Sequence, residues 1–123
     1  MEQYHPYPRP QENGNKTDVR WVSLTNDEGD GLLVVGAPLV AFSAHHYTTD
    51  DFENAKYRYQ MQYREDITLN IDMQQTGVGG DDSWGARTHD EYTVWPGPLK
   101  YSYRLRSLIA SDRPAMEIAR FTR

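Results

Sequence analysis

The sequence predicts an all-β, antiparallel protein of about seven strands. Three observations favour this fold class. Apolar and polar residues alternate with a period of two in several segments, the chain has nine Tyr, three Trp and three Phe, and clusters of Gly, Pro and Asn separate the alternating segments. Pleated strands accommodate aromatic side chains, alternation predicts strands with one buried face, and turn residues mark where strands end.

The expected strands follow these patterns along the chain. They are Val19 to Leu24, Leu32 to Val35, Leu39 to Phe42, Tyr57 to Tyr63, Ile67 to Met73 and Tyr101 to Leu105. The second and third are short apolar runs that residues 36–38 split, so they could be hairpin strands packed on both faces. The other alternating segments are expected to be half-buried, with one wet face.

One helical stretch is expected, with Thr48, Thr49 or Asp50 as its cap and an end near Ala55. Acidic residues in its first turn suit the positive end of a helix dipole. The tail after Ser107 has mixed charge and weak periodicity. We therefore expect an exposed or frayed end, with a helical turn at 115–121.

Composition limits the classes of function. The chain has 13 basic and 18 acidic side chains and a net charge of −5, which argues against nonspecific nucleic-acid binding. No apolar run approaches the roughly 20 residues of a membrane helix, so no membrane partner is expected. The absence of cysteine excludes disulfides, thiolate metal sites and cysteine nucleophiles. Polar, proline-punctuated residues follow Met1, so no signal peptide is expected, and cytoplasmic and periplasmic locations both stay open.

A glycine-rich segment, Gly77 to Trp84, is the strongest candidate for a binding loop. Three glycines in four positions permit positive φ or close approach of the backbone, and two acids and a Trp follow. An exposed indole could stack on the C–H face of a sugar ring. Asp81 and Asp82 could hold a cation, but the spacing is not that of an EF-hand. A packed structural loop and a binding loop both remain open.

Other polar motifs are less specific. Pro10 to Gly14 predicts a turn, although Glu12 and Asn13 could also bind a sugar or another domain. His45 and His46 would point to opposite faces of a strand, so a shared metal would need distant partners. No nucleophile elbow supports a Ser-His-Asp triad, and 18 acids make some carboxylate pair inevitable, so composition identifies no glycosidase pair.

Four segments together resemble the C-terminal, small-chain region of glycoside hydrolase family 2 β-galactosidases, the lacZ-type enzymes. They are Pro10 to Trp21, Phe42 to Thr48, Leu69 to Asp72 and Gly79 to Trp84. They occur in the family's order and spacing, and the resemblance covers roughly residues 7–108. Four separated motifs in order are more specific than any one alone.

The resemblance implies a fold. The family's C-terminal domain is an antiparallel β supersandwich of the galactose-mutarotase-like type, and this chain resembles its second part. Residues 1–108 would be the C-terminal part of that domain and residues 109–123 a tail. The chain is therefore expected to be an excised piece, a fragment or a split gene product.

The resemblance also implies site residues and partners. The family's two catalytic glutamates and their magnesium ligands belong to a TIM barrel that is absent from this sequence. No catalytic or metal-binding residue is therefore assigned here. The Mg²⁺ and the Na⁺ or K⁺ of the parent enzyme are expected in other domains. By motif match, Trp84 would stack on substrate, on the first bound sugar and the acceptor side. Five residues would support its loop: Gly79, Gly80, Asp81, Asp82 and Ser83. The expected partners are the rest of the enzyme and a galactoside, with a homo-oligomer also possible.

Three functional hypotheses follow. The first is a piece of a retaining β-galactosidase, inactive alone, that supplies one wall of the sugar pocket. The second is a stand-alone carbohydrate-binding module, and the third is a purely structural assembly domain. Strands that lack their partners would leave open edges, which predicts self-association or poor solubility.

Overall fold

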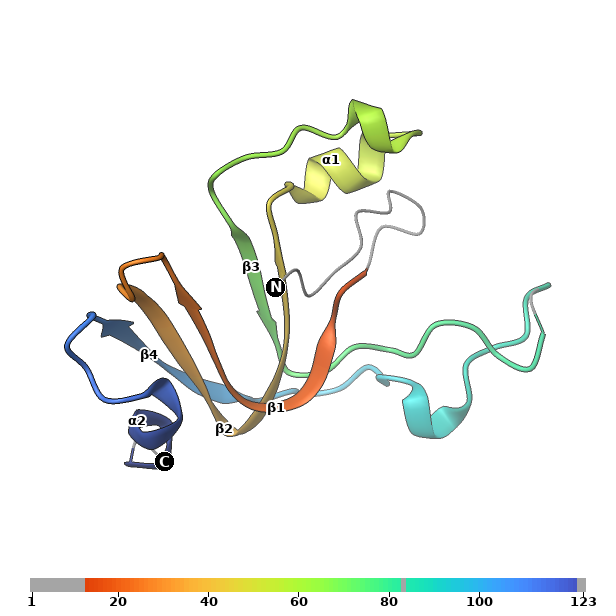
Figure 1. The fold of residues 1–123 in the computed structure, drawn as a ribbon. Coiled ribbons are helices and arrows are strands. Elements are labelled where there is room, and N and C mark those ends of the chain that lie inside the picture. Colours follow the sequence, from red (N-terminus) through yellow and green to blue (C-terminus); the bar gives the residue numbers. More distant parts are fainter. Residues whose placement is uncertain (1–12, 83, 122–123) are drawn as a thin grey trace. The chain divides into compact units, whose positions relative to one another are not determined.

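The structure, a computed structural model, describes residues 13–82 and 84–121. Four strands and four short helices make up this part of the chain (Figure 1). In order they are β1 (Lys16–Thr25), β2 (Gly31–His45), α1 (Thr49–Asn54), η1 (Arg58–Gln60), β3 (Thr68–Asp72), η2 (Asp90–Tyr92), β4 (Ser102–Leu108) and α2 (Ala115–Phe121). The all-β, antiparallel fold class is confirmed, but the expected number of about seven strands is wrong for the described residues. None of the helices described has the length and apolar character needed to cross a membrane.

The strands form a sheet in the order β1-β2-β3, and β4 also pairs with β2. The chain divides into two compact units, and the long strand β2 contributes residues to both. The described residues of the first unit are 13–18 and 41–71, and those of the second are 19–40, 72–82 and 84–121. The boundary predicted at residue 108, between the part of the family domain and the C-terminal tail, stays a prediction.

In the second unit, a tight turn joins β1 to β2. The backbone N–H of Asn26 donates to the carbonyl of Asp30 at 2.9 Å, and Gly29 has a φ of 94°. A Cβ on Gly31 would lie 1.9 Å from the Leu24 carbonyl oxygen, so this close approach needs glycine. β4 then pairs antiparallel with β2, from Gly31 opposite Leu108 to Ala37 opposite Ser102.

The two strands expected at 32–35 and 39–42 form one continuous strand, β2, so the prediction of two separate strands is wrong. A Cβ on Gly36 would lie 2.8 Å from the Leu39 carbonyl carbon, which shows that the backbone bends tightly there without leaving the sheet. Glycine and proline mark bends inside strands as well as turns between them. The expectation that the first run is packed on both faces is confirmed, because Leu33, Val34 and Val35 are all buried.

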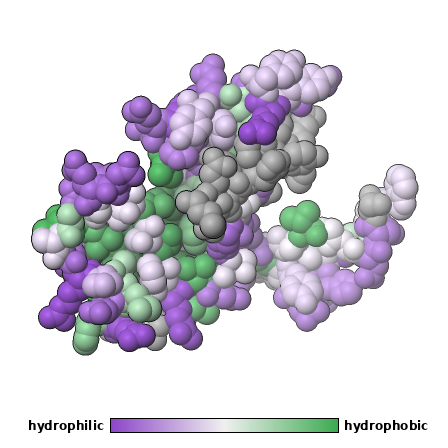
Figure 2. Space-filling model, viewed as in Figure 1, coloured by the Kyte–Doolittle hydropathy of each residue, from purple (hydrophilic) through white to green (hydrophobic). Residues whose placement is uncertain are grey.

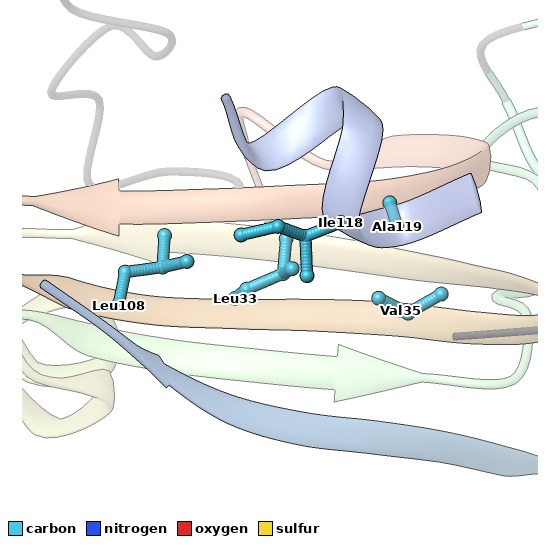
Figure 3. Packing of buried hydrophobic residues seen from close by; sticks show 5 residues of the cluster. All are labelled: Leu33, Val35, Leu108, Ile118 and Ala119. Atoms are coloured by element: carbon cyan, nitrogen blue, oxygen red, sulfur yellow. The ribbon is translucent and has the colours of Figure 1, made fainter. Parts of the chain in front are cut away.

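The core of the second unit lies between β2, β4 and α2. Leu33, Val35 and Leu108 pack there with Ile118 and Ala119 of the helix (Figure 3). The helical turn expected at 115–121 is confirmed as α2. Most described residues after Leu108 are exposed, as expected, but the expectation of a frayed end is wrong, because Ile118 of α2 is only 6% exposed. Burial of two apolar residues on one face anchors this helix, although its sequence periodicity is weak.

In the first unit, α1 is the predicted helix, and Thr48 is its cap. The Thr48 hydroxyl accepts a hydrogen bond from the Asp51 N–H at 3.1 Å, and the Asp51 carboxylate accepts one from the Thr48 N–H at 2.8 Å. Arg64 also donates to Asp51. Partial burial raises the pKa of Asp51, but the hydrogen bonds from Thr48 and Arg64 outweigh it and lower that pKa below its ordinary value.

Substituting Thr48→Ala should lower the free energy of unfolding by about 1 kcal/mol, because it removes the hydroxyl that satisfies a free N–H at the helix start. Urea unfolding followed by circular dichroism measures this change. Thr48→Ser keeps the hydroxyl and is the matched control. Equal losses of stability in the two variants would contradict the capping role.

The strand expected at 57–63 is wrong, because this segment contains the 3-10 helix η1 instead. The Gln60 side-chain oxygen accepts hydrogen bonds from the N–H groups of Lys56 and Tyr57 at 2.7 and 2.9 Å, which closes a turn. Tyr57 and Tyr59 stack on each other with ring centroids 5.5 Å apart. The alternation of tyrosines here thus reflects local stacking rather than a strand face.

A second, smaller core lies in the first unit, where Phe52, Ala55 and Met61 are buried against Tyr47. The expected strand at 67–73 is confirmed as β3. The Asn70 amide donates to the hydroxyl of Ser43, a buried residue of β2, at 3.1 Å. The matched motif at 69–72 therefore has a structural contact.

The strand predicted around residues 101–105 is confirmed as β4, but the prediction that one of its faces is buried is wrong. Every residue of β4 before Leu108 is exposed. Four apolar side chains at and before this strand are among the exposed ones: Leu99, Tyr101, Tyr103 and Leu105. Figure 2 shows hydrophobic and hydrophilic residues side by side on one face of the molecule. The alternation therefore marks a surface that the described part of the chain leaves open.

Candidate functional site

The candidate site is the loop of residues 76–94 between β3 and β4, called here the Trp84 loop (Figure 1). Three hydrogen bonds close its base. The Gly77 N–H donates to the Tyr92 carbonyl at 2.7 Å, the Thr88 hydroxyl donates to the Gly77 carbonyl at 2.9 Å, and the Val94 N–H donates to the Thr76 hydroxyl at 3.2 Å. The two arms of the loop therefore start from a fixed base.

Glycines allow the two arms to approach each other near the tip. A Cβ on Gly80 would lie 2.4 Å from the Arg87 carbonyl oxygen and 2.7 Å from that of Ala86. Those atoms belong to the backbone, so they cannot move aside as a flexible side chain could. Gly79 and Gly85 have φ values of 82° and 127°, a region that other residues rarely adopt.

Asp82 organises the turn at the tip. One of its carboxylate oxygens accepts hydrogen bonds from the Trp84 N–H at 2.8 Å and from the Ala86 N–H at 3.2 Å. The bond from Trp84 and then the bond from Ala86 lower the pKa of Asp82 below its ordinary value, because they favour the charged form. Asp82 is therefore an anion with a structural role, which fixes the backbone at Trp84 and Ala86.

Asp81 has a different partner. Its carboxylate lies 2.7 Å from Nε2 of His89, which is on the opposite arm of the loop. Both side chains are exposed. The two adjacent acids of the motif thus hold different parts of the loop, one the turn around Trp84 and the other the second arm.

The Trp84 side chain is 93% exposed. This agrees with the exposed indole that the sequence suggested, and it excludes packing of Trp84 into a core of the described chain. Gly79, Gly80, Asp81 and Asp82 lie in the same loop, whereas Ser83 lies outside the described residues. His89 and Gly85 were not among the site residues predicted from the sequence. A histidine eight residues after an aspartate follows no periodic pattern that would have revealed the contact.

The remaining sequence candidates have local structural contacts. His45 is buried with its ring against Phe52, and the ring of His46 stacks on Tyr63 while its Nδ1 lies 2.8 Å from the Arg64 carbonyl oxygen. Within residues 13–82 and 84–121, no three His, Asp or Glu side chains gather as a metal site would require. The segment 10–12 lies outside the described residues, and Gly14 has a φ of 68°, as the predicted turn allows.

Comparison with known proteins decides the family. The sequence pattern of the family described as β-galactosidase small chain matches residues 1–106. The chain belongs to the β-galactosidase small-chain family. The matched region includes the whole Trp84 loop and most of β4. α2 lies beyond it, so small-chain membership rests on the sheet and loop rather than on the C-terminal helix.

Curated β-galactosidases resemble this small-chain member over most of its length. The β-galactosidase of Priestia megaterium is 47% identical over 94 residues, which cover 76% of this chain and 9% of that protein. Those of Streptococcus thermophilus and Pseudoalteromonas haloplanktis are 37% and 38% identical over 92 and 104 residues, or 74% and 85% of this chain and again 9% of each relative. The chain thus spans about a tenth of the length of these relatives.

Proposed function

We propose that this chain is the C-terminal part of a retaining β-galactosidase of glycoside hydrolase family 2, and that it forms one wall of the sugar pocket through Trp84. The complete enzyme hydrolyses terminal β-D-galactosides such as lactose. The chain itself holds neither catalytic carboxylate in this proposal. Mg²⁺ and Na⁺ or K⁺ belong to domains outside it.

The observation that carries the proposal is an exposed indole on a constrained loop. Burying a side chain as large as Trp is strongly favourable, so an indole that is 93% exposed lacks that stabilisation within the described chain. Meanwhile Gly80, Asp82 and the hydrogen bonds at the base hold the backbone that carries it. A constrained loop that presents an aromatic ring outward is suited to contact a ligand or another domain.

The chemistry assigns Trp84 to binding rather than to bond cleavage. A retaining glycosidase uses one carboxyl group as acid and base and a second as nucleophile, about 5–5.5 Å apart. An indole supplies neither function, but its flat apolar face can pack against the C–H groups of a pyranose ring. By fixing the sugar relative to the two carboxylates, Trp84 would reduce the entropy that the reaction must lose.

The exposed surface of β4 supports the proposal that a large partner covers it. The side chains of Tyr103 and Leu105 on this strand, and of Tyr101 just before it, are exposed, and solvation of such an apolar surface is unfavourable. In our proposal the rest of the enzyme covers them, including the first part of the same supersandwich domain. Without that partner, the same apolar surface would promote association of two copies.

A complementation assay tests the proposal. The chain is mixed with a β-galactosidase polypeptide that lacks this segment, and hydrolysis of a nitrophenyl β-galactoside is followed; we call the active mixture the reconstituted enzyme. We expect no turnover by either piece alone and turnover by the mixture. Turnover by this chain alone, or a mixture that associates by size-exclusion chromatography without activity, would contradict the proposal.

A stand-alone carbohydrate-binding module is the second candidate, and the full exposure of Trp84 favours it because such modules present aromatic rings to solvent. Titration of the isolated chain with lactose, followed by Trp fluorescence, separates the two. Saturable binding that is lost in Trp84→Ala would favour the module. A flat titration is expected for a pocket wall that needs the remaining domains.

A further inference from the structure

We infer that Asp81 and His89 form a positioning pair that sets the orientation of Trp84 toward the sugar. The inference rests on the proposed function, because it assigns to this pair a share in the substrate binding of the same loop. Neither residue is expected to touch the reacting atoms. Their effect on binding would pass through Trp84.

The place of the pair within the loop suggests this role. The hydrogen bonds at the base join residues 76 and 77 to residues 88, 92 and 94, and the close approach at Gly80 brings the tip of the first arm against residues 86 and 87. The contact of 2.7 Å between Asp81 and His89 is a side-chain link between these two arms. Asp81 lies three residues before Trp84 in the sequence, and His89 lies five residues after it.

The surroundings of the two acids distinguish their functions. The carboxylate of Asp82 accepts hydrogen bonds from the backbone N–H groups of Trp84 and Ala86, so it fixes the turn at these two residues. It cannot by itself fix how that turn is oriented relative to the second arm. The Asp81–His89 contact crosses between the arms and therefore restricts that rotation.

The strength of the contact limits the size of the effect. An ion pair or hydrogen bond between exposed side chains is weak, so its loss should not unfold the loop. It is sufficient, however, to change the population of one loop orientation about three- to five-fold. Removing the pair should therefore raise KM by about three- to five-fold, while kcat stays nearly constant because binding is lost equally from substrate and transition state.

The test uses the reconstituted enzyme with nitrophenyl β-galactoside. His89→Ala should raise KM by about three- to five-fold, and His89→Gln, which keeps a side-chain N–H donor, should recover at least half of that loss. Glu117→Gln is the matched control, because it removes a charge from an exposed residue of α2, outside the Trp84 loop. It should leave KM unchanged.

A double variant shows whether His89 acts through Trp84. If it does, adding His89→Ala to Trp84→Ala should change KM no further, because the group that the pair positions is already absent. Additive effects, failure of His89→Ala to associate, or equal losses in His89→Ala and His89→Gln would overturn the positioning role. If Trp84→Ala raises KM but His89→Ala does not, this inference alone fails. If Trp84→Ala has no effect, the proposed function fails as well.

Discussion

Replacing Ile118 with Ala should lower the free energy of unfolding of the second unit by about 2–5 kcal/mol. Ile118 is 6% exposed and packs with Leu33, Val35 and Leu108, so the substitution leaves a cavity between α2 and the sheet. A helix of seven residues is unstable alone, and this contact provides most of its stabilisation. Urea unfolding of the chain, monitored by circular dichroism, measures the loss.

Met116→Ala is the control for this experiment, because Met116 lies on the same helix but is 48% exposed. It should reduce stability by less than about 1 kcal/mol, since little buried surface is removed. Equal effects of the two substitutions would show that α2 does not pack on the sheet as described. The result is informative because α2 lies beyond residues 1–106, the region that the family pattern matches.

Gly80→Ala in the reconstituted enzyme should reduce kcat/KM by up to about ten-fold. The added Cβ would lie 2.4 Å from the Arg87 carbonyl oxygen and 2.7 Å from that of Ala86. The backbone must shift to relieve these contacts, which moves the loop tip, and even small displacements of a binding group can cost this much in rate. Steady-state kinetics with nitrophenyl β-galactoside measure the change.

Gly97→Ala serves as the matched glycine control, because no atom lies within 4 Å of a Cβ built there and its φ is not in the left-handed region. We expect wild-type kinetics from it. Circular dichroism should also show that Gly80→Ala leaves the sheet intact. Wild-type kinetics in Gly80→Ala would contradict the close approach of the two arms of the Trp84 loop.

Local signals in the sequence predicted the elements that local interactions determine. The helix at 49–54 has its cap and first-turn acids within six residues, so its start and end were predictable. β3 follows from strict alternation. In contrast, burial of α2 depends on contacts with β2, about 80 residues earlier in the chain, which no local pattern encodes. Tertiary packing therefore decided the structure of the tail.

Two other errors arose because one pattern has more than one structural origin. Glycine and proline at residues 36–38 occupy a bend inside β2, although the same residues usually end a strand. Alternating tyrosines at 57–63 stack across a 3-10 turn and do not line a sheet face. Propensity alone cannot distinguish these cases, because the distinction depends on which backbone groups find partners.

The candidate site was predictable to the same extent. The motif at 79–84 placed the glycines, the two acids and Trp84 in one loop, and the structure shows Trp84 exposed there. The sequence could not assign separate partners to Asp81 and Asp82. Nor could it identify His89, because a contact between two arms of an irregular loop depends on loop geometry rather than on residue spacing.

The most direct test of the central claim is the KM of the reconstituted enzyme with and without the Trp84 indole. If Trp84 contacts the sugar, Trp84→Ala should raise KM by about ten-fold, equivalent to the loss of about 1.4 kcal/mol of binding, while Trp84→Phe should retain part of the effect. Val78→Ala, which truncates an apolar side chain of the same loop that is 88% exposed, should leave KM unchanged. Restored activity with the same KM in wild type and Trp84→Ala would contradict the claim and make the chain a structural part of the enzyme.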